Sequence, residues 1–118
     1  EILENRPDLE PKHRIDILRN ECYSEHFIEH SPNIPDGRDA LLSLFESRYK
    51  KYPKLSMSIK RTASDGDLVW LHLHVKHTPE SLGGAAIQIF RMEEGKIVEH
   101  WGVGQSVPKE SKNINTMF

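Results

Sequence analysis

The sequence has little of what defines several large classes of protein. Its one cysteine, Cys22, excludes an intrachain disulfide and a zinc site built from several cysteines, and it suits the reducing cytoplasm, where we expect the protein. No apolar run approaches the roughly 18 residues of a membrane span, and no signal peptide is visible. The formal charge is −2, from 16 basic and 18 acidic side chains, so no basic field favours nucleic acid or an anionic membrane as partner.

Motifs of several common enzyme classes are also missing. The sequence contains no phosphate-cradling glycine loop, no dinucleotide-binding fingerprint and no G-x-S-x-G motif. Cys22 carries no surrounding signature of a nucleophile. Any chemistry must therefore come from side chains outside these motifs.

The first half of the chain predicts helices. Apolar residues at spacings of three and four predict a short helix over residues 12–22, and a second helix begins after Asp36 as N-cap and ends before Pro53. Between them, residues 23–37 hold two prolines and predict a structured connection. Residues 1–12, with two prolines among charges, predict short turns.

After Pro53 the apolar period changes to 2, which predicts strands over residues 55–60, 68–77, 85–92 and 97–107. Short turns between them favour antiparallel pairing. The 118 residues fit one domain, residues 1–118, of α+β class, with N-terminal helices packed on an antiparallel sheet. Two helices cannot cover a long curved sheet, so we expect a concavity where a small ligand binds.

The strand over residues 68–77 carries two histidines on one face. Trp70, His72 and His74 alternate with apolar residues, and the two imidazoles stand about 7 Å apart at Cα. Such a pair can line a pocket, act as acid and base, or bind a metal, and it can equally lie on a half-solvated surface. Other histidines and Glu80 have no diagnostic spacing for a third metal ligand.

Further candidates lie in a loop and in the last strand. His30 stands just before two prolines and a helix start, where a rigid loop either presents it to a cavity or leaves it exposed. In "EHWGVGQ" (99–105), His100, Gly102 and Gly104 share one face. The glycines mark either a bulge or the close approach of another group. The aromatic side chains, Phe27, Phe90 and Trp101 among them, serve as core or as ligand wall.

Four segments together resemble the SnoaL-like polyketide cyclase family, of the nuclear transport factor 2-like superfamily. They cover roughly residues 20–118 and read "FIEHSPNIPDGRDAL", "DGDLVWLHLHVKH", "AAIQIFRMEEGKIVEHWGVGQSVP" and "NTMF". The resemblance implies a cone-shaped α+β barrel in which a strongly curved antiparallel sheet wraps around the helices and a pocket opens inside. It also implies a homodimer.

The family's cyclases close a ring by aldol condensation without cofactor or metal, and a pocket aspartate moves the proton while histidines stabilise the enolate. The resemblance implies an apolar or carbonyl-containing ligand and three catalytic histidines, His30, His72 and His74. It implies a pocket lined by Phe27, Trp70, Gln88, Phe90, His100 and Gly102. We expect His72, His74 and Gly102 to face one shared hollow.

One departure from the family pattern stands out. The family's "EHWD" reads "EHWG" here, so Gly102 replaces the acid–base aspartate, and Gln88 stands where relatives often have an acid. Loss of a positioned general base typically lowers a rate by about 10²–10⁴-fold. Three hypotheses follow: an aldol cyclase or isomerase in which a histidine moves the proton, a non-catalytic binding module for an apolar small molecule, or a structural protein with a vestigial pocket.

Overall fold

The computed structural model describes residues 5–6 and 8–118, so the turns predicted over residues 1–12 lie partly outside the described residues. In chain order, its elements are α1 (Pro11–Ile17), the π-helical turn η2 (Leu18–Cys22), β1 (Tyr23–Glu29), α2 (Arg38–Lys51), β2 (Ser56–Asp65), β3 (Leu68–Lys76), β4 (Gly84–Glu93) and β5 (Lys96–Ser106). No helix among these residues is long and apolar enough to cross a membrane.

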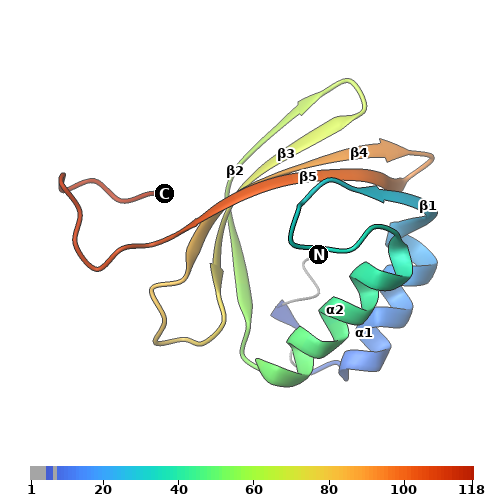
Figure 1. The fold of residues 1–118 in the computed structure, drawn as a ribbon, viewed down its shortest axis with the longest axis horizontal. Coiled ribbons are helices and arrows are strands. Elements are labelled where there is room, and N and C mark those ends of the chain that lie inside the picture. Colours follow the sequence, from blue (N-terminus) through green and yellow to red (C-terminus); the bar gives the residue numbers. More distant parts are fainter. Residues whose placement is uncertain (1–4, 7) are drawn as a thin grey trace.

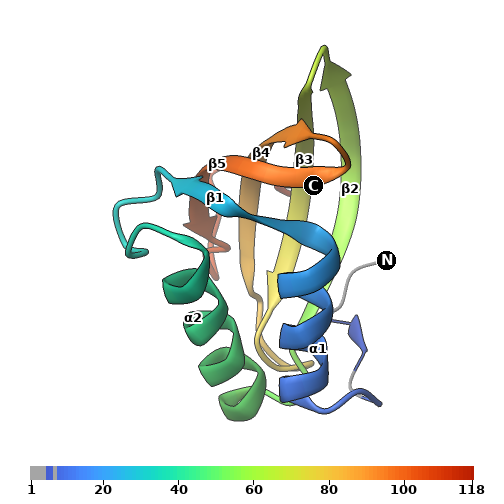
Figure 2. The ribbon, with the colours of Figure 1, turned by 90° about the vertical axis from the view of Figure 1, so that its right-hand side faces the viewer.

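The five strands form one strongly bent, open sheet in the order β1-β5-β4-β3-β2. Figure 1 shows both helices on the concave side of this sheet, and Figure 2 shows α1 and α2 side by side. The α+β class with helices packed on a curved sheet is confirmed. The expectation of a wholly antiparallel sheet is wrong, because β1 pairs with β5 in parallel, although the other pairs are antiparallel.

The strand β1 replaces the loop that the two prolines predicted. Pro32 and Pro35 lie beyond its end, where they do not disturb it, and the preceding helix ends only at Cys22. Tyr23, Phe27 and Glu29 of β1 are buried, whereas Glu25, in the same alternation, is exposed. β1 thereby places residues from the N-terminal half of the chain beside the last strand.

Asp36 does not serve as the N-cap of α2. That position belongs to Gly37, whose φ of 96° favours glycine, and no side chain caps the helix there. The Asp36 carboxylate instead accepts hydrogen bonds from the backbone N–H of Gly37 and of Glu29, each at 2.9 Å. Asp36 therefore connects the start of α2 to the end of β1.

The hydrophobic core fills the space between the helices and the sheet. Its buried members are Ile15, Leu18, Tyr23, Phe27, Leu41, Leu42, Tyr49 and Leu55. Val75 of β3 and Ile97 of β5 pack against them from the sheet. We call the face of the sheet that turns toward this core the inner face, and the opposite one the outer face.

Strand register assigns each side chain to a face, because directly paired antiparallel residues point to the same side. Leu71 pairs with Gln88, which pairs with Gly102, and Phe90 pairs with His100. These rows belong to the inner face, where Leu73 and His100 are 3% and 9% exposed. The other rows form the outer face, which includes His72 and also Trp70 and Val103, 40% and 72% exposed.

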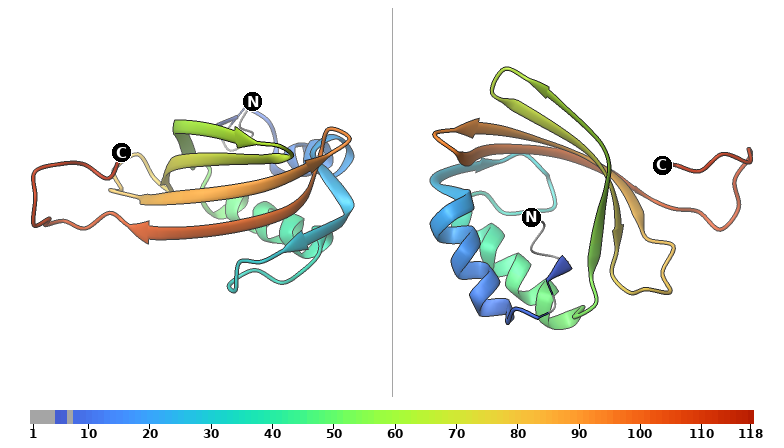
Figure 3. Two further views of the ribbon diagram at one scale, coloured as in Figure 1. Left: turned by 90° about the horizontal axis from the view of Figure 1, so that it is seen from above. Right: turned by 180° about the vertical axis from the view of Figure 1, so that it is seen from behind.

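Beyond Ser106 the chain runs away from the sheet and then turns back, as both views of Figure 3 show. Its last residue, Phe118, stacks on the outer-face imidazole of His74, with ring centroids 4.0 Å apart. Residues 108–116 are exposed, and Ile114 is fully so. The segment therefore contributes to the outer face and leaves the inner face untouched.

Candidate functional site

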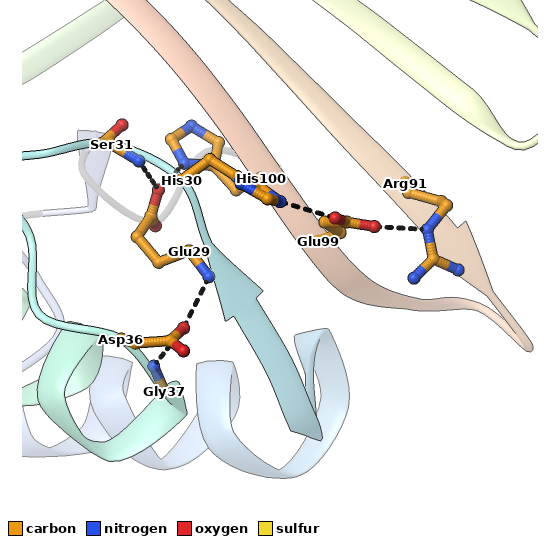
Figure 4. Close-up of polar contacts among 8 residues, drawn as sticks. All are labelled: Glu29, His30, Ser31, Asp36, Gly37, Arg91, Glu99 and His100. Atoms are coloured by element: carbon orange, nitrogen blue, oxygen red, sulfur yellow. Dashed lines mark hydrogen bonds and ion pairs between the residues drawn. The ribbon is translucent and has the colours of Figure 1, made fainter.

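A buried carboxylate and a buried imidazole meet on the inner face, at the junction of β1 and β5. The Nδ1 atom of His100 lies 2.6 Å from Oε1 of Glu29, and the Glu29 side chain has no exposed surface (Figure 4). A carboxylate in this position holds the proton on Nδ1, fixes the orientation of the ring and leaves Nε2 for other partners. This is the arrangement of an oriented acid–base group.

The Glu29 side chain is itself held by the loop that follows it. The backbone N–H of Ser31 donates to Oε1 of Glu29 at 3.0 Å, and the Glu29 N–H donates to Asp36 (Figure 4). The second carboxylate oxygen, Oε2, is buried and has no hydrogen-bond partner among the described residues. Glu29 is therefore positioned from both ends and keeps one unused acceptor.

Gln88 occupies the space beside Gly102. Its Oε1 atom contacts Nε2 of His100, so the ring is bonded on both sides. A Cβ atom at position 102 would lie 2.5 Å from Gln88 Oε1 and 3.1 Å from Cε1 of His100. Gly102 thus marks the close approach of another group, one of the two alternatives that the sequence left open, and that group is a side chain of this protein.

The aromatic side chains predicted to line the pocket divide between two environments. Phe90 lies beside the site, with its ring centroid 5.1 Å from that of His100. Phe27 is 4% exposed, packs edge-on against Tyr23 and belongs to the hydrophobic core. The inner face therefore brings together Gln88, Phe90, His100 and Gly102 from the predicted set.

The strand histidines lie on the other side of the sheet. His72 accepts a hydrogen bond from Arg61 at 3.0 Å, and His74 Nε2 donates to the backbone carbonyl of Leu82 at 2.9 Å. Trp70 shares their face. The expectation that His72 and His74 face one hollow with Gly102 is wrong, because alternation groups residues by face but does not say which face turns inward.

His30 also lies on the outer face, although its neighbour Glu29 points inward. Its ring stacks parallel to Trp101 at 4.8 Å, and its Nε2 donates to Glu99 at 2.6 Å. Glu99 also accepts from Arg91 at 2.8 Å (Figure 4). The hydrogen bond from His30 has the largest effect and that from Arg91 the next largest, and both hold the pKa of Glu99 below its usual value. The structure thus separates His30 from His100 by the thickness of the sheet.

No group of three metal-binding side chains among residues 5–6 and 8–118 is arranged to hold an ion. Hollows in this part of the chain include one of 290 Å³ and one of 400 Å³. Val75, His77 and Gly83 are among the residues that line the first, and Asp36, Arg38 and Asp39 are among those that line the second. Neither is lined by the Glu29–His100 pair.

The sequence interpretation missed Glu29. The residue lies in the segment predicted to be a connection, and its burial depends on a strand pairing between distant parts of the chain. One signal was available: in "YSEHFIE" the residues Tyr23, Phe27 and Glu29 fall on one face of an extended strand. An acidic residue in line with two aromatics would have indicated a buried carboxylate.

The architecture defines the class first: a bent, open sheet that wraps around two helices, with a polar cluster on its concave face. The chain belongs to the family of SnoaL-like domains, whose model matches residues 11–100. No match was found among curated proteins.

Solved structures share the fold at low sequence identity. TsrD from Streptomyces laurentii is 19% identical over 86% of this chain and 79% of its own, with a TM-score of 0.62. IdmH from Streptomyces antibioticus, a candidate polyketide cyclase, is 19% identical over 85% and 86%, with a TM-score of 0.63. A SnoaL-like protein of unknown function from Burkholderia thailandensis is 17% identical over 86% and 89%, with a TM-score of 0.66.

Proposed function

We propose that this SnoaL-like protein binds an apolar small molecule that contains a carbonyl group and moves a proton beside that carbonyl, as in an aldol cyclisation or an isomerisation. His100 is the acid–base group and Glu29 is its positioning partner. The observation that carries the proposal is the buried bond between Glu29 and His100, next to Gly102, the position at which the resemblance implies an aspartate in other members. A carboxylate is therefore still present, one imidazole away.

The chemistry needs no group outside the chain. Neutral His100 takes a proton from the carbon beside the carbonyl through Nε2, and the electron pair of the broken C–H bond moves to the carbonyl oxygen to give an enolate. The imidazolium then carries two protons, and the Glu29 carboxylate stabilises its positive charge. Return of the proton to carbon or oxygen restores the neutral ring. His30, His72 and His74 take no part in these steps, because they lie across the sheet.

The test measures deuterium uptake beside the carbonyl of α-tetralone, a flat and mainly apolar ketone, in D₂O. We expect exchange catalysed by the protein, reduced by about 10²-fold or more in His100→Gln and less in Glu29→Gln. The matched control is His26→Gln, because the His26 side chain is 86% exposed. Equal exchange by His100→Gln and the unchanged protein would contradict the assignment of the acid–base group.

The second candidate is a binding module without catalysis. It is favoured by the filled space at Gly102, where the Gln88 amide is bonded to the nitrogen that would act on substrate. In that case α-tetralone shifts the NMR signals of inner-face residues but takes up no deuterium above the uncatalysed rate between pH 6 and 9. His100-dependent exchange at any of these pH values excludes the module.

We also propose that the protein forms a homodimer through its outer face. That face exposes Trp70, Ile87 and Val103, which lie on three adjacent strands and belong to one apolar surface. A two-fold interface buries the same patch of both subunits, so each apolar side chain there counts twice. Val103→Glu should convert a dimer to a monomer in light scattering after size exclusion. The proposal would be contradicted if the unchanged protein were a monomer at about 100 µM.

A further inference from the structure

We propose that Gln88 is a displaceable cap on His100, and that the ligand of the site is a compound whose carbonyl or enol oxygen takes the place of the Gln88 amide. The inference rests on the proposed function, since it concerns the same imidazole. It goes further by naming the residue that controls access to Nε2 and the ligand atom that must meet it.

The cap is defined by two contacts of the Gln88 amide and by the aromatic ring beside the imidazole that it covers. Oε1 meets Nε2 of His100, and the amide lies in the recess that the absence of a side chain at Gly102 leaves. Phe90 lies beyond the imidazole on the same strand as Gln88. Of the charged groups near the ring, Glu29 of β1 bonds Nδ1, and Asp36 bonds the backbone of Glu29, whereas Glu99 and Arg91 lie on the outer face.

A glutamine suits both protonation states of His100. With Oε1 toward the ring, the amide accepts from an Nε2–H, which suits a ring that is protonated at both nitrogens and faces the Glu29 carboxylate. Rotation of the amide by 180° presents its NH₂ group, which donates to Nε2 of a neutral ring. A carboxylate at this position would accept only. Gln88 therefore bonds Nε2 in either protonation state of the ring when no ligand is present.

A ligand must replace this bond with one of its own, because a buried nitrogen left without a partner is unfavourable. A carbonyl or enol oxygen does so: a carbonyl or enolate oxygen accepts from the imidazolium, as Oε1 does, and an enol hydroxyl donates to the neutral ring. A hydrocarbon of the same shape does not. The Phe90 ring lies beside the imidazole, and the backbone at Gly102 carries no side chain. These surroundings suit a ligand whose oxygen is attached to a flat apolar ring system.

The first experiment needs no ligand. In ¹⁵N NMR of the imidazoles, Gln88→Leu removes the cap, and Gly102→Ala expels it because the new Cβ occupies its place. Both should change the Nε2 signal of His100 and preserve the bonded Nδ1 signal. Gln105→Leu, the same replacement at an exposed position of β5, is the control and should change neither. An unchanged Nε2 signal in both variants overturns the cap, whether or not the protein is an enzyme.

The second experiment compares α-tetralone with tetralin, which has the same rings and no oxygen. At saturation the ketone should shift His100 Nε2 and the Gln88 side-chain amide in the unchanged protein, and tetralin should shift neither. Gln88→Leu should lower the apparent Kd for the ketone by about fivefold, because no internal bond competes. Absent or equal shifts with the two compounds overturn the ligand class. Shifts at Nε2 without any deuterium exchange would instead uphold the cap and refute catalysis.

Discussion

Glu29 and His100 stand 71 residues apart in the sequence, and their side chains meet at 2.6 Å in the interior. Adjacent residues of the same two strands form a second pair on the opposite face, His30 with Glu99, also at 2.6 Å. The dipeptides Glu29–His30 and Glu99–His100 are thus joined by one hydrogen-bonded pair on each face of the sheet (Figure 4). The inner pair carries the proposed chemistry, and both pairs attach β1 to β5.

Removal of one partner of the inner pair should lower the free energy of unfolding more than removal of both partners. Glu29→Leu leaves His100 buried beside an apolar group and should lower the free energy of unfolding by about 3 kcal/mol. The double variant Glu29→Leu/His100→Leu should lose less, because no unpaired polar group remains in the interior. Urea unfolding followed by tryptophan fluorescence measures both. A double variant that loses the sum of the two single losses would contradict this coupling.

The outer pair should make stability depend on acid pH. The bonds from His30 and Arg91 hold the pKa of Glu99 below its usual value of 4.5. A carboxyl with a depressed pKa in the folded state contributes stability that is fully present above its unfolded pKa and is lost as the pH falls through the folded one. Glu99→Gln should therefore lower the urea midpoint at pH 7 and flatten its decline below about pH 4.5.

The exposed residue Glu80 offers a control for that measurement, because Glu80→Gln makes the same chemical change on a surface loop. It should leave the free energy of unfolding at pH 7 within about 0.5 kcal/mol of that of the unchanged protein. If Glu80→Gln and Glu99→Gln flattened the acid decline equally, the bonds to Glu99 would not be its source.

An aspartate at position 102, which the resemblance implies for other members, should be tolerated only if Gln88 is also changed. Gly102→Asp alone forces a Cβ to within 2.5 Å of the Gln88 amide and should cost about 1–3 kcal/mol of stability. Combination with Gln88→Ala frees the space, so the pair should recover most of this loss and should raise exchange in α-tetralone. A thermal unfolding series over the two single variants and the double variant measures the coupling. Strict additivity would show that the two side chains do not share the space.

Gly83 should tolerate a side chain far less than Gly66 does. Both have positive φ, 73° and 59°, so alanine costs about 1 kcal/mol at either one. A Cβ at Gly83 would in addition collide with the backbone carbonyl of Val75, whereas nothing lies within 4 Å at Gly66. Gly83→Ala should therefore lose clearly more than Gly66→Ala in urea unfolding. Equal losses would mean that the β3–β4 loop moves away at no measurable cost in free energy.

Much of the fold could be predicted from local patterns. The helix α2 follows from its apolar spacing and from Pro53, and four strands follow from a period of 2 with turns between them, as the sequence analysis stated. The strand β1 could not be predicted in this way. Its burial comes from pairing with β5, more than 70 positions later, and the prolines of the following loop concealed it.

The candidate site could be predicted only in part. His100 and Gly102 were placed on one face because β5 alternates regularly, and Gln88, which came from the resemblance, lies beside them in the structure. His72 and His74 were assigned to the wrong face, although the apolar Leu71, Leu73 and Val75 between them indicate which side turns to the core. The resemblance to a family gave residue types at positions but not the direction of each side chain, which only the tertiary packing determines.

The two Glu–His dipeptides also fix the register of β1 along β5. If β1 slid by one residue along β5, an imidazole would face an imidazole inside, and the carboxylate would point into solvent. Only one alignment satisfies both sides of the sheet at once. The proposed acid–base group is therefore oriented only after β1 has paired with β5. A partly folded molecule without this pairing should be inactive.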